Sequence, residues 1–190
     1  MIFLIDGHSI AFRAFYALPE TLETKDGFPT NVIHGFLMML SKLVNNYDVE
    51  KIIITWDVSK KTFRNEIYED YKANRSSSPD NFKIQINKLQ SLLTKFNLPQ
   101  VSLEGYEADD VLGSLSKHFN KKNKKVTIVT GDRDSFQLIS SKTHVMYTKR
   151  GISDVEIFDS NVFTEKYQIN TNQYICLLYT SPSPRDKRLS

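Results

Sequence analysis

Acidic side chains in this 190-residue chain follow the ends of short apolar runs, or open a helix that follows such a run. Seven acids share this placement: Asp6, Asp57, Glu107, Asp109, Asp110, Asp132 and Asp134. Because ligands bind beyond the carboxyl ends of strands in an open parallel sheet, we expect these side chains to meet in one crevice. Clustered carboxylates repel one another unless protons or hard cations neutralise them, and oxygen ligands favour Mg²⁺ or Mn²⁺ over zinc. The placement therefore predicts a divalent-metal site.

The elements that would position these acids alternate between strands and helices. Strands are expected at residues 2–6, 51–57, 101–104 and 125–131, and then within HVMYTK and DVEIF. Helical periodicity is found at residues 9–18, 31–47, 82–96, 108–119 and 160–167. This alternation predicts an α/β fold with a mostly parallel central sheet flanked by helices.

Residues 58–80 interrupt this alternation. The segment is polar, basic and interspersed with aromatic residues, and it is too long for an ordinary connection between a strand and a helix. We expect a partly helical segment that stands over the metal crevice. On charge grounds, Arg64 within it is expected to contact a phosphate.

The composition is that of a soluble globular domain, with 40% hydrophobic residues, 25% charged residues and a net charge of +3. No apolar run approaches the roughly 20 residues of a membrane span, so we expect no membrane association. A single cysteine, Cys176, excludes an internal disulfide framework and fits a reducing cytoplasm.

Three residues around the predicted crevice are expected to have supporting roles only. Gly7 should let the backbone turn sharply after the first strand, and His8 should line the edge of the crevice. Trp56 should pack in the core, facing away from the acid that follows it. The four histidines have no zinc-site spacing.

The chain from Cys176 onward, CLLYTSPSPRDKRLS, loses the periodic pattern, and we expect neither a strand nor an amphipathic helix there. This stretch is typical of a disordered tail, and it resembles the artefactual end of an assembled reading frame. The expected division is a domain at residues 1–175 followed by a tail at residues 176–190.

Four blocks carry a family resemblance: LIDGHSIAFRAFYAL, TWD followed by FRNEIYEDYKANR, GYEADDVLGSL, and TGDRDSFQLI. In this order they resemble the 5′–3′ exonuclease domain of bacterial DNA polymerase I, a member of the flap endonuclease family, over residues 1 to about 175. The resemblance implies a PIN-like 5′ nuclease fold with a helical arch over residues 58–80. It also implies phosphodiester hydrolysis by two Mg²⁺ or Mn²⁺ ions.

The resemblance further assigns roles to individual residues. The first metal would take Asp6, Asp57, Glu107, Asp109 and Asp110, and the second would take Asp132 and Asp134. In the arch, Tyr71, Lys72 and Arg75 would contact single-stranded 5′ DNA, with the two basic residues also acting in catalysis. Arg13 would contact a phosphate near the metals and assist catalysis.

The implied substrates are DNA with a 5′ flap, nick or free 5′ end, and RNA primers on DNA, in the bacterial nucleoid. The implied protein is a monomer whose full-length parent carries a polymerase domain. The family pattern continues into a block with two further acids and a duplex-binding element, which this sequence lacks, so we expect an impaired fragment. Three alternatives stay open: a branched-DNA-binding module without turnover, a PIN-like RNase, and an aspartate-dependent phosphatase or receiver domain.

Overall fold

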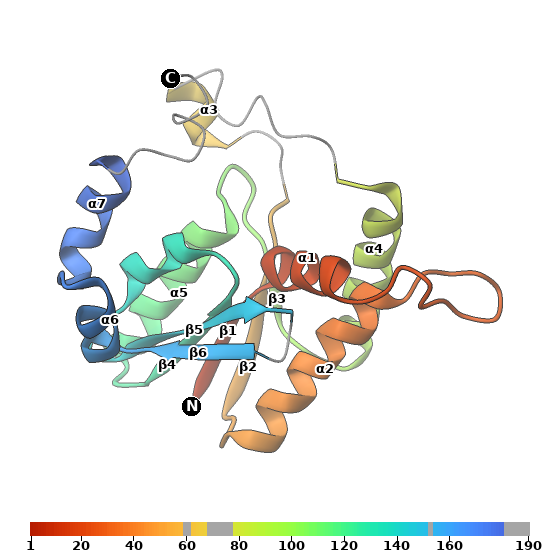
Figure 1. The fold of residues 1–190 in the computed structure, drawn as a ribbon, viewed down its shortest axis with the longest axis horizontal. Coiled ribbons are helices and arrows are strands. Elements are labelled where there is room, and N and C mark those ends of the chain that lie inside the picture. The colour runs from red at the N-terminus through yellow and green to blue at the C-terminus, as the bar shows by residue number, and fades with distance from the viewer. Residues whose placement is uncertain (59–61, 68–77, 152–153, 181–190) are drawn as a thin grey trace.

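The computed structural model describes residues 1–58, 62–67, 78–151 and 154–180. Within them one six-stranded sheet has the order β3-β2-β1-β4-β5-β6 (Figure 1). The strands are β1 (Ile2–Asp6), β2 (Lys51–Thr55), β3 (Gln100–Val101), β4 (Val126–Thr130), β5 (Thr143–Arg150) and β6 (Asp154–Phe158). All neighbouring pairs are parallel except β5 and β6. The expected α/β class with a mostly parallel sheet is therefore confirmed.

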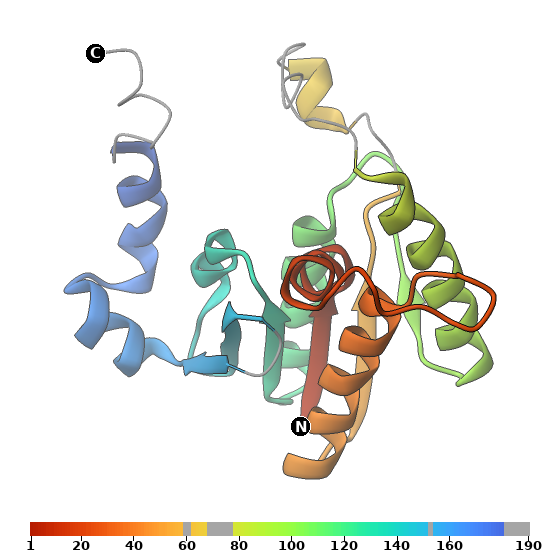
Figure 2. The same ribbon diagram turned by 45° about the vertical axis from the view of Figure 1, so that its right-hand side comes forward.

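Helices cover both faces of this sheet (Figures 1 and 2). One face carries α1 (Gly7–Ala17), α2 (Asn31–Asn46) and α4 (Asp80–Lys95). The other carries α5 (Ala108–Lys121), η1 (Arg133–Leu138), α6 (Ser160–Tyr167), η2 (Thr171–Gln173) and α7 (Tyr174–Thr180). Because both faces are covered, β1 is buried throughout: Phe3 packs in one core cluster and Leu4 in the other.

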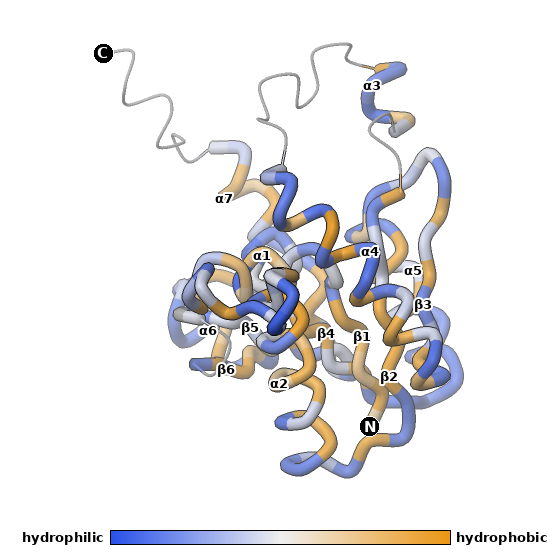
Figure 3. The backbone as a smooth tube through the Cα atoms, turned by 90° about the vertical axis from the view of Figure 1, so that its right-hand side faces the viewer, coloured by the Kyte–Doolittle hydropathy of each residue, from blue (hydrophilic) through white to orange (hydrophobic). Residues whose placement is uncertain are grey.

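The short helix α3 (Phe63–Ile67) belongs to the segment expected to stand over the crevice. It lies beyond the carboxyl ends of the strands, apart from the sheet (Figures 1 and 2), and its tube is mostly hydrophilic in Figure 3. The Phe63 amide donates to the Gly105 carbonyl at 3.0 Å, and the Phe63 and Tyr106 rings are 5.5 Å apart. These contacts attach α3 to the loop that leads into α5.

The expected elements differ from the observed ones mainly at their ends. β3 has two residues where four were expected, and α1 begins at Gly7, directly after β1. The expected turn after the first strand is present, because α1 follows β1 without a loop, but Gly7 makes it without a positive φ. Instead, a Cβ there would lie 2.5 Å from the Trp56 ring and 2.8 Å from the Thr55 carbonyl oxygen. Gly7 is needed for a close approach of buried neighbours.

The expectation that no helix follows Cys176 was wrong for residues up to Thr180, because α7 spans Tyr174–Thr180. Tyr174 is buried and its ring contacts Phe163, with centroids 5.3 Å apart. Most of the other α7 side chains are exposed, so the helix has little hydrophobic periodicity to recognise. Residues 181–190 of the expected tail lie outside the described residues. Within the described part of the chain, no helix has the length and apolar character needed to cross a membrane.

Candidate metal centre

The topology brings acids from separate parts of the chain to one edge of the sheet. β1 pairs in parallel with both β2 and β4, so the three strands end side by side. A crevice of about 740 Å³ opens at this edge between α1, the start of α5 and the turn after β4. Five of its lining side chains are acids: Asp6, Asp57, Glu107, Asp109 and Asp132.

Asp6 is the most enclosed of these acids, with 6% of its surface exposed. It ends β1 and caps α1, since its Oδ1 accepts the Ser9 amide at 3.1 Å. Its Oδ2 accepts the Thr130 hydroxyl at 2.9 Å. Burial raises the pKa of Asp6 to about 6; these two hydrogen bonds oppose the rise, and repulsion from Asp57 and Asp132 adds to it. The ionised form of Asp6 is therefore strongly disfavoured in the metal-free crevice.

The pKa of Asp109 is raised further than that of Asp6. Burial, followed by repulsion from Asp6, Asp132, Asp57 and Glu107, raises the pKa of Asp109 to about 7. These acids are therefore close enough for the ionisation of one to oppose that of another. Such a site gains most when a cation neutralises it.

The remaining crevice acids are fixed by the backbone around them. Asp57 lies two residues beyond β2, and its Oδ1 accepts the Ala108 amide at 2.7 Å, which ties the end of β2 to α5. The Asp57 amide donates to Nδ1 of His8 at 3.3 Å. Burial lowers the pKa of His8, and Asp57 opposes this change. Asp132 caps η1, its Oδ1 accepting the Asp134 amide at 3.0 Å.

The donor set fits a hard divalent cation, because carboxylate oxygens from several elements converge on one crevice. As placed, no three His, Cys, Asp or Glu side chains among the described residues are close enough together to hold one ion. Two of the crevice acids are held by backbone donors, Asp6 by the Ser9 amide and Asp57 by the Ala108 amide.

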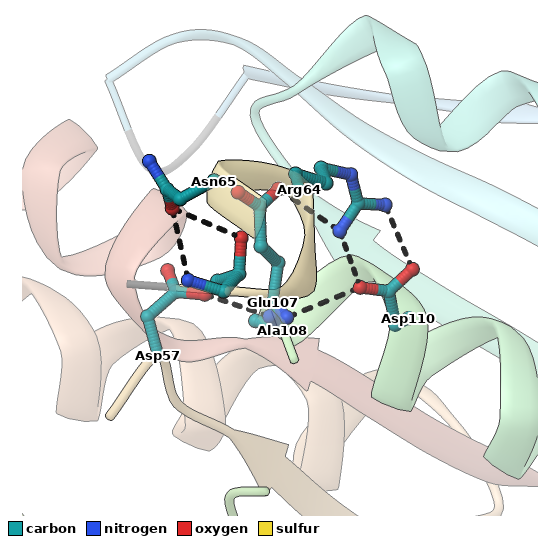
Figure 4. A network of polar contacts seen from close by, with 7 residues as sticks. Asp57, Arg64, Asn65, Glu107, Ala108 and Asp110 are labelled. Atoms are coloured by element: carbon teal, nitrogen blue, oxygen red, sulfur yellow. Dashed lines mark hydrogen bonds and ion pairs between the residues drawn. The ribbon is translucent and has the colours of Figure 1, made fainter. Parts of the chain in front are cut away.

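Asp110 faces away from this crevice. It accepts both guanidinium NH₂ groups of Arg64, at 2.7 and 2.9 Å, and its Oδ2 also accepts the Glu107 amide at 3.1 Å (Figure 4). Asp110 was expected in the crevice with the other acids, but it is not among the residues that line it. The structure also pairs Arg64, the expected phosphate contact, with an acid of the predicted metal site.

Asp134 is not among the residues that line the crevice. It lines a second groove of about 1320 Å³ between α3, α5, η1 and α7, which Glu107 and Asp109 line as well. Arg13 does line the crevice. Its guanidinium donates to the carbonyls of Gly131 and Lys149, each at 3.2 Å, and to the Tyr147 hydroxyl at 3.4 Å. Arg13 is therefore held against the ends of β4 and β5. Tyr71, Lys72 and Arg75 lie outside the described residues.

Sequence reasoning missed three residues that shape the crevice. The Ser9 hydroxyl accepts the Gly131 amide at 2.8 Å, and the Thr130 hydroxyl accepts the Asp132 amide at 3.0 Å. A Cβ on Gly131 would lie 2.5 Å from Nε of Arg13. The spacing of Asp6 and Ser9 is a helix-cap signal that could have been recognised. Nothing local to the sequence indicates the other two contacts.

The fold and the crevice define an α/β domain with a carboxylate cluster at the carboxyl edge of a mostly parallel sheet. A family model described as the N-terminal resolvase-like domain of 5′–3′ exonucleases matches residues 1–168. The chain belongs to this family of 5′–3′ exonuclease N-terminal domains.

Similar proteins agree with this membership. DNA polymerase I of Mycobacterium bovis is 41% identical over 174 residues, which cover 91% of this chain and 19% of that protein. The chain therefore spans about a fifth of the length of such relatives. The D15 protein of bacteriophage T5, crystallised with metal ions, superposes with a TM-score of 0.74 at 18% identity, over 92% of this chain and 64% of that one. The T5 D15 flap endonuclease complex with DNA and metal ions gives a TM-score of 0.68 at 18% identity, over 92% and 63%. These structures share the fold.

Proposed function

We propose that this chain is the catalytic part of a metal-dependent 5′ nuclease that hydrolyses phosphodiester bonds in DNA. The observation that carries the proposal is the crevice of five acids, in which burial and mutual repulsion raise the pKa of Asp109 to about 7. Family membership supports the same conclusion, since the matching model describes a 5′–3′ exonuclease domain.

In this proposal the crevice acids would hold Mg²⁺ or Mn²⁺, with Asp110 and Asp134 joining after local rearrangement. The bound ions would activate a water molecule and stabilise charge on the attacking and leaving oxygens. Within the chain, Ser9 and Thr130 orient Asp6, and Ala108 orients Asp57.

Arg13 stands on the crevice wall, where a phosphate beside the metals could reach it. Lys72, Arg75 and Tyr71 are proposed to bind the 5′ strand as parts of an arch. The first two would neutralise phosphates and Tyr71 would stack on a base.

The proposed substrates are DNA with a 5′ flap, nick or free 5′ end, and RNA primers on DNA. The T5 relative bound to DNA and the polymerase I relatives support this substrate class. We further propose that residues 1–175 form the nuclease domain, that the longer parent carries a polymerase domain, and that the protein acts as a monomer in the bacterial cytoplasm.

The test is cleavage of a 5′-labelled flap substrate with Mg²⁺, with EDTA, and by Asp132→Asn. A matched substitution, Asp26→Asn, changes an exposed acid that does not line the crevice. Cleavage that requires Mg²⁺ and is lost only in Asp132→Asn would support the proposal. A comparison with a chain extended by the family's next segment would measure how much that segment adds. Mg²⁺-independent cleavage, or no cleavage by either chain, would refute the proposal.

A further inference from the structure

An ion pair joins α3 to the first turn of α5 at the rim of the acid crevice. Arg64 contacts Asp110 through both of its terminal nitrogens, and NH1 is also 3.9 Å from Oε2 of Glu107 (Figure 4). The Arg64 side chain is 29% exposed, and those of Asp110 and Glu107 are 27% and 14% exposed. A two-pronged pair with this degree of shielding is stronger than an ordinary surface salt bridge.

The same pair supplies much of what attaches α3 to the domain. No residue of α3 is buried, so the helix has little apolar packing to hold it. Its other contacts to the domain include the Phe63 amide bond to Gly105 and the ring contact with Tyr106. Loss of the Arg64 pair should therefore loosen α3 without unfolding the sheet.

Arg64 and a divalent ion would draw on the same carboxylates. Asp110 accepts the guanidinium at both oxygens, and Glu107, its neighbour in the pair, lines the crevice. A cation bound at Glu107 would lie a few ångströms from the guanidinium, and two positive charges at that separation repel each other. Occupation by one therefore weakens occupation by the other.

We propose that Arg64 is an internal counter-ion that competes with the divalent metal for Glu107 and Asp110, so that metal binding releases α3 from α5. The proposal rests on the metal-dependent function proposed above. By thermodynamic linkage, if metal binding weakens the Arg64–Asp110 ion pair, the ion pair lowers the affinity for the metal by the same free energy. The proposal also accounts for the observed pairing of Asp110 with Arg64: in the metal-free domain each neutralises the charge of the other.

The test measures Mg²⁺ affinity by calorimetry, at low ionic strength, for the full chain and three variants. Arg64→Gln removes the charge and should bind Mg²⁺ about 10- to 30-fold more tightly, the effect of removing one positive charge about 4 to 6 Å from a divalent ion through water. Arg64→Lys keeps the charge and should bind Mg²⁺ nearly as the parent does. The control Lys124→Gln removes the same charge from a 2.7 Å pair with Glu50, just before the amino ends of β4 and β2, and should leave the affinity unchanged.

Hydrogen exchange at residues 62–67 provides a second readout. In the parent chain Mg²⁺ should speed exchange there, although ion binding ordinarily slows exchange. In Arg64→Gln exchange should already be fast and insensitive to Mg²⁺. A residue with only a packing role would not tighten metal binding when it is replaced.

Unchanged or weaker Mg²⁺ affinity in a natively folded Arg64→Gln overturns the proposal. A purely phosphate-binding Arg64 would also overturn it: Arg64→Gln would then reduce the salt dependence of DNA binding and leave Mg²⁺ affinity constant. If the parent chain binds no Mg²⁺ at all, both the proposed function and this inference fail. If the parent binds Mg²⁺ but Arg64→Gln does not bind it more tightly, only this inference fails.

Discussion

Asp109→Asn should stabilise the metal-free domain at high pH and lose most of this advantage at low pH. The pKa of Asp109 rises from 3.8, its ordinary value, to about 7 in the folded chain. Folding therefore opposes ionisation of this carboxyl, so the native state binds more protons than the unfolded state between these values. Stability consequently falls as the pH rises from about 4 to about 7, and the cost is complete above that range.

The size of the effect follows from the same two values. A difference of about three pH units corresponds to about 4 kcal/mol when the carboxyl is fully ionised. At pH 5 the cost is about 2 kcal/mol, because the native carboxyl is still protonated while the unfolded one is ionised. Asparagine removes the charge, so its advantage should shrink by about 2 to 3 kcal/mol from pH 8 to pH 5. Solvent screening of the partly exposed carboxylate reduces this to about half.

Urea denaturation in EDTA at several pH values from 5 to 8 measures this advantage directly, with Asp26→Asn as the control at an exposed position. The control should show no pH-dependent gain. A gain in Asp109→Asn that is the same at pH 5 and pH 8, or a loss of stability at pH 8, would refute the claim that burial and repulsion raise the pKa of Asp109.

Two further substitutions test the packing that positions the crevice. Gly7→Ala places a methyl group 2.5 Å from the buried Trp56 ring, so we expect the free energy of unfolding in urea to fall by about 2 kcal/mol. In the control Gly113→Ala, the new Cβ meets only the end of a side chain at 3.3 Å, so the change should be neutral or stabilising by up to about 1 kcal/mol. Equal losses in both variants would contradict the steric argument. Gln85→Ala removes a buried amide that donates to Oδ1 of Asn31 at 2.8 Å, and should cost about 2 kcal/mol. The double variant with Asn31→Ala should cost less than the sum of the two single changes, and strict additivity would show that the pair does not interact.

The sequence was most informative where burial is two-sided. The run IFLID is apolar up to its final aspartate, and VTIVT combines Val and Ile with two threonines that are also buried; both are central strands of the sheet, covered on both faces. The acids that follow such runs were predictable for the same reason, since parallel strands end at one edge. Asp6, Asp57 and Asp132 were correctly expected to converge.

The parts that could not be predicted depend on contacts between distant residues. Asp110 is adjacent to Asp109 in a helix, so the two side chains point to different sides. The pairing of Asp110 with Arg64, 46 residues away, cannot be read from the local sequence. The helix α7 depends on Tyr174 reaching a distant aromatic cluster, which leaves no periodicity in its own sequence. Gly131 must lack a side chain because Arg13, more than a hundred residues away in the sequence, packs against its Cα.

Anomalous diffraction from crystals soaked in Mn²⁺ tests the central claim most directly, because it locates the ion rather than its effect. The account predicts a manganese peak in the crevice within coordination distance of carboxylates from at least two elements, with Asp6 of β1 and Asp109 of α5 among them. The same soak of Asp109→Asn should weaken or remove that peak. Manganese bound only elsewhere on the domain, with the crevice acids unchanged, would contradict the account.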